Sequence, residues 1–307
     1  MVHLAGGNEL AIGAEFEREH GTNRTRYSII GSQVPADFDL MRSTSSAYSE
    51  LKWLATRDLI VRAGVRFDSV TDNGSHHSPT LGVRYNLPSN GGGFKANYSE
   101  GFKPASFFAL GLPVALGGNP DLRAERSKGM SFGYENSYWD GSGTGSVGLF
   151  RTRYADLVTF DNQTNRLVNA NRVEIKGVEI EGGLQVTLAL KVHLQFTRLF
   201  THVIDSDEPL RQRPGRRGGM QVNWSPAATS TVIWRIEYAA ATFDSSVVTG
   251  NVTLPTYLRS DIAYTQALRA GISAVVAVDN LFNKRNESYI GQTAPGRRVR
   301  AAVSGSF

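Results

Sequence analysis

Histidines and acidic residues are the side chains in this sequence that could do metal chemistry. The adjacent pair His76-His77 could offer two imidazole nitrogens to a transition metal. Asp205, Asp207 and Glu208 could offer oxygen ligands to calcium. The histidine pair lies in a stretch of Gly, Ser and Asn that is typical of a polar loop, and the three acids lack the dense ligand spacing of a calcium loop. We therefore expect no metal site and no bound cofactor.

Covalent catalysis has no recognisable machinery in the sequence. The 307 residues include no cysteine, which excludes disulfides, thiolate metal sites and cysteine nucleophiles. We find no serine, histidine and acid that are spaced so that strands would bring them together as a nucleophile setting. The formal net charge of +5 is modest and no basic face or helix is recognisable in the sequence, which disfavours nucleic acid as a partner. We expect the protein not to be an enzyme.

Aromatic side chains together with a cation point to another chemistry, the binding of a ligand. Phe107, Phe108, Arg211 and Tyr289 are the candidate binding residues. Aromatic rings and a guanidinium can hold a large, flat and anionic complex. In the alternative interpretation, Phe107 and Phe108 only pack their own segment onto neighbouring strands. A shared site requires that segments far apart in the sequence meet in space.

Long β-strands are the elements that would position these residues. From Leu59 to Asp68, apolar side chains alternate strictly with polar or small ones, which is the period of a strand. Such segments run roughly ten to fifteen residues, longer than the five or six of a soluble β-sandwich, which is the alternative fold. The pattern predicts an all-β chain, a transmembrane antiparallel β-barrel with one face toward lipid and one toward a wet lumen. About fourteen strands are expected, starting near Glu9, Thr44, Asp58, Pro79, Gly92, Glu125, Gly145, Asn171, Lys191, Arg216, Ala228, Thr256, Gly271 and Arg297.

The connections between these segments alternate in length, as in outer-membrane barrels with tight periplasmic turns and long outer loops. We expect lumen arginines to pair with lumen acids, namely Arg62, Arg66, Arg84, Arg235 and Arg300 with Glu179, Glu181, Glu237 and Asp261. The expected long loops carry the four candidate binding residues on one side of the membrane and run over Gly21 to Arg42, Lys103 to Arg123, Asp161 to Ala170, Asp205 to Gly215, Phe243 to Leu254 and Phe282 to Pro295.

The two ends of the sequence differ in what they signal. The final segment from Arg298 alternates as a barrel strand should and stops on Phe307. A terminal phenylalanine on such a strand resembles the assembly signal that the outer-membrane insertion machinery recognises. The start at Met1 shows no basic region and no apolar stretch of signal-peptide length. An exported protein would therefore need a further segment before it.

Ordered motifs give the sequence a resemblance to the β-barrel of TonB-dependent receptors. Gly118 to Ser127 is similar to the family's Gly-Asn-Pro-x-Leu-x-Pro-Glu-x-Ser element, with Ala124 in place of the usual proline. Asn97 to Ala105 resembles its aromatic, Gly-Phe-Lys-Ala-Pro segment, with Pro104 and Ala105 exchanged. The remaining motifs are Tyr154-Ala155-Asp156-Leu157-Val158, Ile175-Lys176-Gly177-Val178-Glu179 and Val278-Asp279-Asn280-Leu281-Phe282-Asn283-Lys284 followed by Tyr289 and Pro295-Gly296-Arg297.

The resemblance implies a role in nutrient uptake across the outer membrane of a Gram-negative cell. Family members enclose a plug in a 22-stranded barrel, so residues 1–307 would be the C-terminal portion of the barrel, with the plug and first strands outside it. The implied ligand is a ferric siderophore, another metal chelate or cobalamin. The implied partners are outer-membrane lipid, the insertion machinery and, through a missing N-terminal region, the TonB complex. The alternative is a plugless passive pore or a structural barrel remnant.

Overall fold

One antiparallel sheet dominates the computed structural model, which describes residues 2–29, 31–88, 91–161, 163–204, 209–246, 248–269 and 271–305. The sheet has 15 strands in these residues, and each pairs with the next along the chain. They are β1 (Val2–His3), β2 (Glu9–Asn23), β5 (Phe38–Leu54), β6 (Leu59–Val70), β7 (Gly74–Asn86), β8 (Gly93–Lys103), β9 (Glu125–Tyr138), β10 (Gly143–Asp161), β11 (Arg166–Thr187), β12 (Leu190–Val203), β13 (Arg216–Ala227), β14 (Ser230–Ala239), β17 (Tyr257–Arg269), β18 (Ile272–Asp279) and β21 (Arg298–Gly305).

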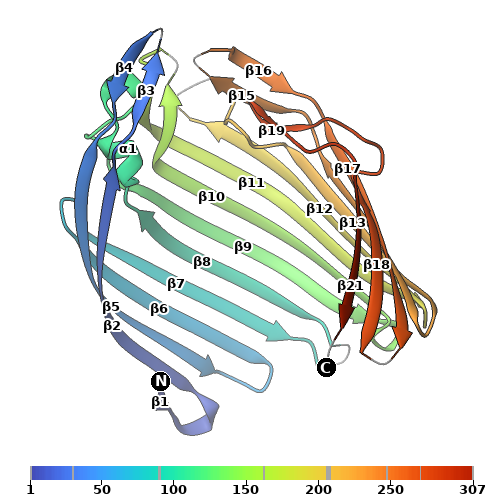
Figure 1. Cartoon of the computed structure of the whole chain (residues 1–307). Helices are drawn as coiled ribbons and strands as arrows, with labels where there is room; N and C mark the ends of the chain where they lie inside the picture. Colours follow the sequence, from blue (N-terminus) through green and yellow to red (C-terminus); the bar gives the residue numbers. More distant parts are fainter. Residues whose placement is uncertain are drawn as a thin grey trace.

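Three single-turn 3-10 helices lie in the connections, η1 (Ala5–Gly7) between β1 and β2, η2 (Val114–Leu116) between β8 and β9, and η3 (Trp139–Gly141) between β9 and β10. The other elements outside the sheet gather at one of its ends. They are a short helix α1 (Phe107–Gly111) and three small hairpins, β3 (Arg26–Ile29) with β4 (Ser32–Pro35), β15 (Thr242–Ser246) with β16 (Gly250–Leu254), and β19 (Glu287–Tyr289) with β20 (Gln292–Thr293). All of them lie at the upper end in Figure 1, where the long connections gather, and the short turns lie at the lower end. In the part of the chain that the structure describes, no helix is long and apolar enough to span a bilayer.

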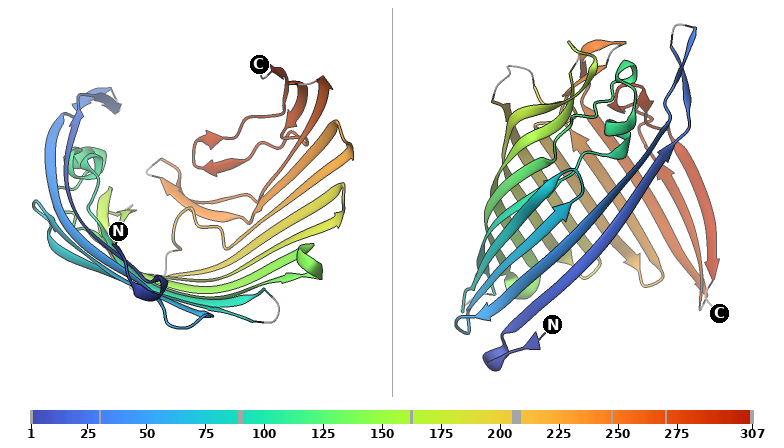
Figure 2. Two further views of the ribbon diagram at one scale, coloured as in Figure 1. Left: turned by 90° about the horizontal axis from the view of Figure 1, so that it is seen from below. Right: turned by 90° about the vertical axis from the view of Figure 1, so that its left-hand side faces the viewer.

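The sheet curls into a trough whose two rims stand apart (Figure 2). Among the described residues β1 and β21 are the edge strands, each paired on one side only. Helix α1 lies on the concave side (Figure 2). Arg42 of β5 donates a hydrogen bond to the Ala105 carbonyl of the α1 loop at 2.9 Å, so the Arg42 face of β5 is the concave face. Because side chains alternate along a strand, the register fixes the face of every other strand residue.

In the lower part of β2, polar and apolar side chains separate between the two faces. On β2, Glu15 and Glu19 point to the concave face, while Ile12 and Phe16 point to the convex face and are 70% and 69% exposed. Apolar side chains this open to the surroundings fit a lipid-facing wall. The predicted all-β, antiparallel barrel architecture is confirmed, and fourteen of the fifteen strands start within six residues of the expected positions.

Ion pairs connect side chains of nearby strands on the concave face. Three of the five predicted lumen arginines form ion pairs, but with partners nearer in the register than the acids expected for them. Arg66 bonds Asp68 at 2.8 Å and Glu15 at 3.0 Å. Arg84 bonds Glu135 at 2.6 Å, and Arg300 bonds Asp279 at 2.8 Å. The acids that pair are those two residues along or one or two strands across, because a long side chain reaches no further on a sheet.

The strands extend further at their upper ends than the sequence pattern indicates. Strand β5 begins at Phe38 rather than near Thr44, β7 at Gly74 rather than near Pro79, and β11 at Arg166 rather than near Asn171. The expectation that His76-His77 lies in a loop is therefore wrong, since both residues are in β7. Above the bilayer both faces of a hairpin are wetted, so backbone pairing continues while the apolar alternation stops.

Candidate ligand site

The loop between β8 and β9 is folded down onto the concave wall. The Ser106 hydroxyl caps α1 by accepting a hydrogen bond from the Ala109 amide at 3.2 Å. Ala105, Ala109 and Leu122 are buried together, with Leu110, Val158 and Leu167 packed around them. The Arg42 guanidinium lies 4.7 Å from the centre of the Phe107 ring, a cation–π contact. The loop is thus fixed by an apolar core and by the wall beneath it.

The Gly-Asn element of this loop joins it to β11. The Asn119 side chain donates to the Leu167 carbonyl at 2.8 Å and accepts from the Asp121 amide at 3.0 Å. The Leu167 amide in turn donates to the Gly117 carbonyl at 2.8 Å. Asn119 is only 6% exposed, so these bonds form away from water. They hold the loop against the tall β10–β11 hairpin.

Asp244 on β15 connects three outer loops through one buried carboxylate, which is 1% exposed. It accepts from the Ser245 and Ile290 amides at 2.9 Å each. It also accepts from Arg211 at 3.1 Å and from the Gln212 side chain at 3.3 Å. Arg211 and Gln212 belong to the β12–β13 connection and Ile290 to the β18–β21 connection. We call these five residues the Asp244 clamp.

The acidity of Asp244 makes the clamp dependent on pH in one direction. Burial alone would raise the pKa of this carboxyl, but the Ile290 and Ser245 amides and the Arg211 guanidinium outweigh burial and hold the pKa below its usual range. Because the pKa of Asp244 is lower in the folded state, the ionised carboxylate stabilises the folded loops. This stabilisation is complete at a pH above the ordinary carboxyl pKa, and it disappears as the pH falls through the folded-state pKa.

We therefore expect the Ile290 amide to keep constant exchange protection between about pH 8 and about pH 5, because the ordinary aspartate pKa is about 4. Protection should fall only below that range. Hydrogen exchange corrected for intrinsic rates measures it, with the Ala267 amide, bonded to the Thr229 carbonyl at the opposite end of the sheet, as an internal reference. A loss of protection already at neutral pH would contradict the assignment.

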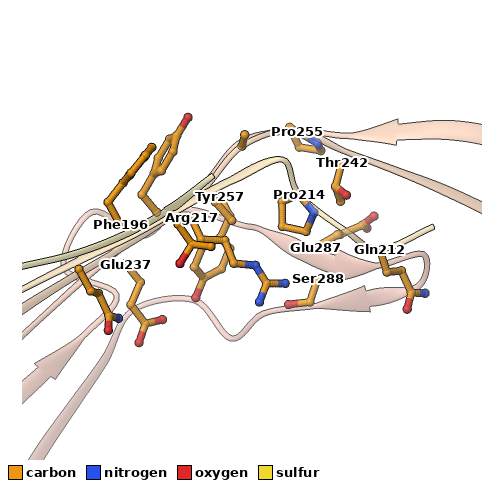
Figure 3. A pocket seen from close by; sticks show the side chains of 16 residues that line it. Phe196, Gln212, Pro214, Arg217, Glu237, Thr242, Pro255, Tyr257, Glu287 and Ser288 are labelled. Carbon is orange, nitrogen blue, oxygen red and sulfur yellow. The ribbon is translucent and has the colours of Figure 1, made fainter. Parts of the chain in front are cut away.

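A cavity of about 470 Å³ opens where the clamp meets the concave wall. Arg217, Glu237 and Tyr257 reach it from β13, β14 and β17, while Phe196 points away from them on the other side of the strands (Figure 3). The Thr242 hydroxyl oxygen is buried there and has no hydrogen-bond partner in the described residues. The outer connections contribute six further residues to the lining of the cavity, namely Gln212, Pro214, Thr242, Pro255, Glu287 and Ser288.

This lining suits a polar organic ligand of moderate size. Small-molecule sites usually measure about 300–1,000 Å³, and a few polar groups set among apolar walls fix the orientation of the ligand. Here a guanidinium, two carboxylates, two carboxamides and three aliphatic hydroxyls line the cavity together with the rings of two prolines. Within the described residues no three histidine or acidic side chains gather as a metal ion would need. The lining groups offer hydrogen bonds and charges of both signs.

The sequence of residues 3–281 matches the family described as "TonB dependent receptor-like, beta-barrel". The chain belongs to this family. Its location is therefore the outer membrane of a Gram-negative cell, and the family consists of transport receptors. The match covers the barrel strands from β2 to β18, so the predicted membership of the TonB-dependent receptors is confirmed.

Several solved structures have the same barrel fold as this chain. The ferric-catecholate import receptor Fiu from Escherichia coli K12 matches with a TM-score of 0.80 at 16% identity, over 98% of this chain and 52% of that one. The siderophore receptor PirA from Acinetobacter baumannii matches at 0.79 and 19%, over 100% and 53%. The copper transporter OprC matches at 0.79 and 15%, over 98% and 54%. These likenesses show the fold, and the chain spans about half the length of the structures it matches.

The four predicted binding residues lie on the outer side of this TonB-dependent receptor barrel but not at one point. Phe107 is packed against the wall at Arg42, and Phe108 beside it is 50% exposed. Arg211 is engaged by the Asp244 clamp. Tyr289, 45% exposed, follows Ser288 of the cavity. Phe307 lies outside the described residues, as do Asp205, Asp207 and Glu208.

Sequence reasoning missed the residues that form the cavity and the clamp, except Arg211. Arg217 and Tyr257 stand at the upper ends of strands with their side chains on the concave face, a position that alternation alone could have identified. Glu237 was predicted as a partner of a lumen arginine rather than as part of a site. Asp244 carries no local signal, because its donors come from 32 to 46 residues away, apart from the adjacent Ser245.

Proposed function

We propose that the chain is the ligand-binding barrel portion of a receptor that imports a metal chelate, with a ferric siderophore as the first candidate. The observation that carries this is the cavity of about 470 Å³ beneath the outer loops, lined by Arg217 and by neutral and acidic hydrogen-bonding groups. Membership of the TonB-dependent receptor family and the likeness to the Fiu and PirA barrels support it. Cobalamin is the second ligand to be tested.

In this proposal residues 1–307 act as one C-terminal barrel domain. The outer loops capture the chelate, and Arg217 attracts its negative charge toward the lumen while Glu237 and Tyr257 bond its polar edge. Phe108 and Tyr289, both exposed on the outer side, offer ring faces during capture. A plug and a coupling segment that meets the TonB complex would belong to the remainder of the whole receptor.

Replacing Arg217 with alanine tests the ligand assignment. We expect affinity for an iron(III) tris-catecholate to fall about tenfold or more, because a charge-assisted hydrogen bond contributes about 1.5–3 kcal/mol. Equilibrium dialysis with radioactive iron on the purified chain in detergent measures the change. Arg62→Ala is the matched control, since Arg62 lies on the same concave face on β6 but not at the cavity.

Two outcomes would overturn the proposal. One is equal affinity of the Arg217→Ala and Arg62→Ala variants. The other is that the unsubstituted chain binds neither catecholate, hydroxamate nor cobalamin probes. The passive-pore alternative makes a separate prediction, a steady conductance in a planar bilayer that no chelate alters, so conductance recorded with and without ligand distinguishes the two functions.

A further inference from the structure

The convex face of the sheet carries a band of positive charge that the ligand site does not use. We define this outer cation belt by its six residues, Lys128, Arg151, Arg153, Lys176, Arg198 and Arg216. The register places them side by side on neighbouring strands β9 to β13, with Lys128 opposite Arg153, Arg151 opposite Lys176, and Arg198 opposite Arg216. Alternation puts all six on the convex face with Leu149 and Ile180, which are 53% and 49% exposed.

The height of the belt places it at the outer margin of the membrane. Arg151 and Arg198 each lie about eight residues above the short turns at Gly143 and Leu190. At about 3.3 Å per residue and a tilt of about 40°, that is about 20 Å along the barrel axis. The apolar band of an outer-membrane barrel is about 25 Å tall, so side chains at this level reach the head groups of the outer leaflet. Below the belt, Phe132, Leu149 and Val178 form an apolar row across three strands.

The carboxylates on this part of the convex face do not balance the belt. Glu100 bonds Lys128 at 3.0 Å, and Glu174 bonds Arg153 at 3.0 Å as well as Arg151 and Lys176. Arg198 and Arg216 lie directly opposite one another and have no carboxylate partner among the described residues. Like charges directly opposite on a sheet are destabilising. An anion that lies between them would remove that repulsion.

We propose that the outer cation belt binds the phosphate groups of anionic lipid head groups in the outer leaflet. Guanidinium groups bond phosphate oxygens in a two-pronged geometry, and juxtamembrane cations attract anionic lipid. The surrounding surface fits a lipid rather than a free ion. The Arg198 guanidinium stacks 4.9 Å from the centre of the Phe200 ring, and Phe196 and Met130 lie beside the belt on the same face, exposed for contact with acyl chains.

The test compares lipid binding by the purified whole chain and by two double variants. Arg198→Gln with Arg216→Gln removes the two belt cations that have no carboxylate partner in the described part of the chain, and Arg62→Gln with Arg235→Gln removes two cations from the concave face. The probe is a diphosphorylated lipid in neutral detergent micelles, with phosphatidylcholine and inorganic phosphate as comparison ligands, and lipid binding is read by native mass spectrometry. We expect the belt variant to lose tenfold or more in affinity for the diphosphorylated lipid and the concave-face variant to be unchanged.

A third variant keeps the result interpretable if the glutamine variant fails to fold. Arg198→Lys with Arg216→Lys retains the charge and should retain most of the lipid affinity, with folding checked by heat-dependent gel mobility. Equal binding of phosphatidylcholine would overturn the proposal, as would a glutamine variant that is folded and binds as tightly as the unsubstituted chain. If inorganic phosphate bound as tightly as the lipid, the proposal that a lipid supplies the bound phosphate would be wrong. Retention of an acidic protein without lipid would assign the belt to a protein partner instead.

Discussion

Replacement of Asp244 with alanine is expected to free three outer loops at once. The carboxylate is 1% exposed and accepts hydrogen bonds from two backbone amides and two side chains. Its loss leaves the Arg211 charge and the Ile290 amide without their partner, and removal of one member of a buried ion pair costs about 3–5 kcal/mol. The loops should therefore open locally while the strands of the barrel remain paired.

Hydrogen exchange at the Ser245 and Ile290 amides measures this effect. A cost of about 3 kcal/mol corresponds to a protection about a hundredfold lower. Affinity for the chelate should fall in parallel, because Gln212 belongs both to the clamp and to the cavity. Asp39→Ala is the control, since Asp39 is also an outer-side carboxylate but is 67% exposed in its pair with His20. Unchanged protection in the Asp244 variant would show that the loops are held by other contacts.

Gly118→Ala is the second change with a large expected effect. A Cβ atom at this position would lie 1.8 Å from the Leu112 carbonyl oxygen and 2.5 Å from its carbon, both backbone atoms that no rotamer change can move. Overpacking in a tight site costs about 1–3 kcal/mol, and a clash with backbone belongs at the upper end. We expect the α1 loop to detach from the β10–β11 hairpin.

The Leu167 amide reports on that detachment, because it donates to the Gly117 carbonyl at 2.8 Å. Its exchange protection should fall about a hundredfold for a cost of about 3 kcal/mol. Gly101→Ala is the matched control on β8, where the nearest atom to an added Cβ is the Ser127 hydroxyl oxygen at an ordinary 3.5 Å. Equal protection in the two variants would mean that the loop adapts to the added methyl group.

Alternation of side chains was enough to predict the strands, because one face of each must meet lipid. Strand β9 begins at Glu125 and β13 at Arg216, as expected from the sequence. The same signal ends where the strand leaves the membrane, so the upper part of β5 from Phe38 was expected as loop. The Gly-Asn-Pro motif correctly marked a turn, while the bond from Asn119 to Leu167 depends on a strand 48 residues away.

The candidate site was less accessible to sequence reasoning than the fold. Its residues are brought together by register and by loop packing, as when Asp244 accepts from Ile290 across 46 residues. Phe107 was predicted as a binding residue because an aromatic ring can contact a ligand. In the structure its ring instead contacts Arg42 and covers the wall at Gly21. The outer cation belt is visible only when alternation is followed from strand to strand, since its members are scattered from residue 128 to residue 216.

The hairpin of β10 and β11 continues to pair from Leu157 with Ala170 up to Asp161 with Arg166, above the last pairs that β9 and β12 make with it (Figure 1). A part of the chain that stands higher than the strands beside it is open to antibodies and phages on an intact cell. Peptide tags inserted between Asp161 and Arg166 should therefore be displayed on living bacteria. Labelling such tags from outside would report how many copies have reached the surface with this end outward.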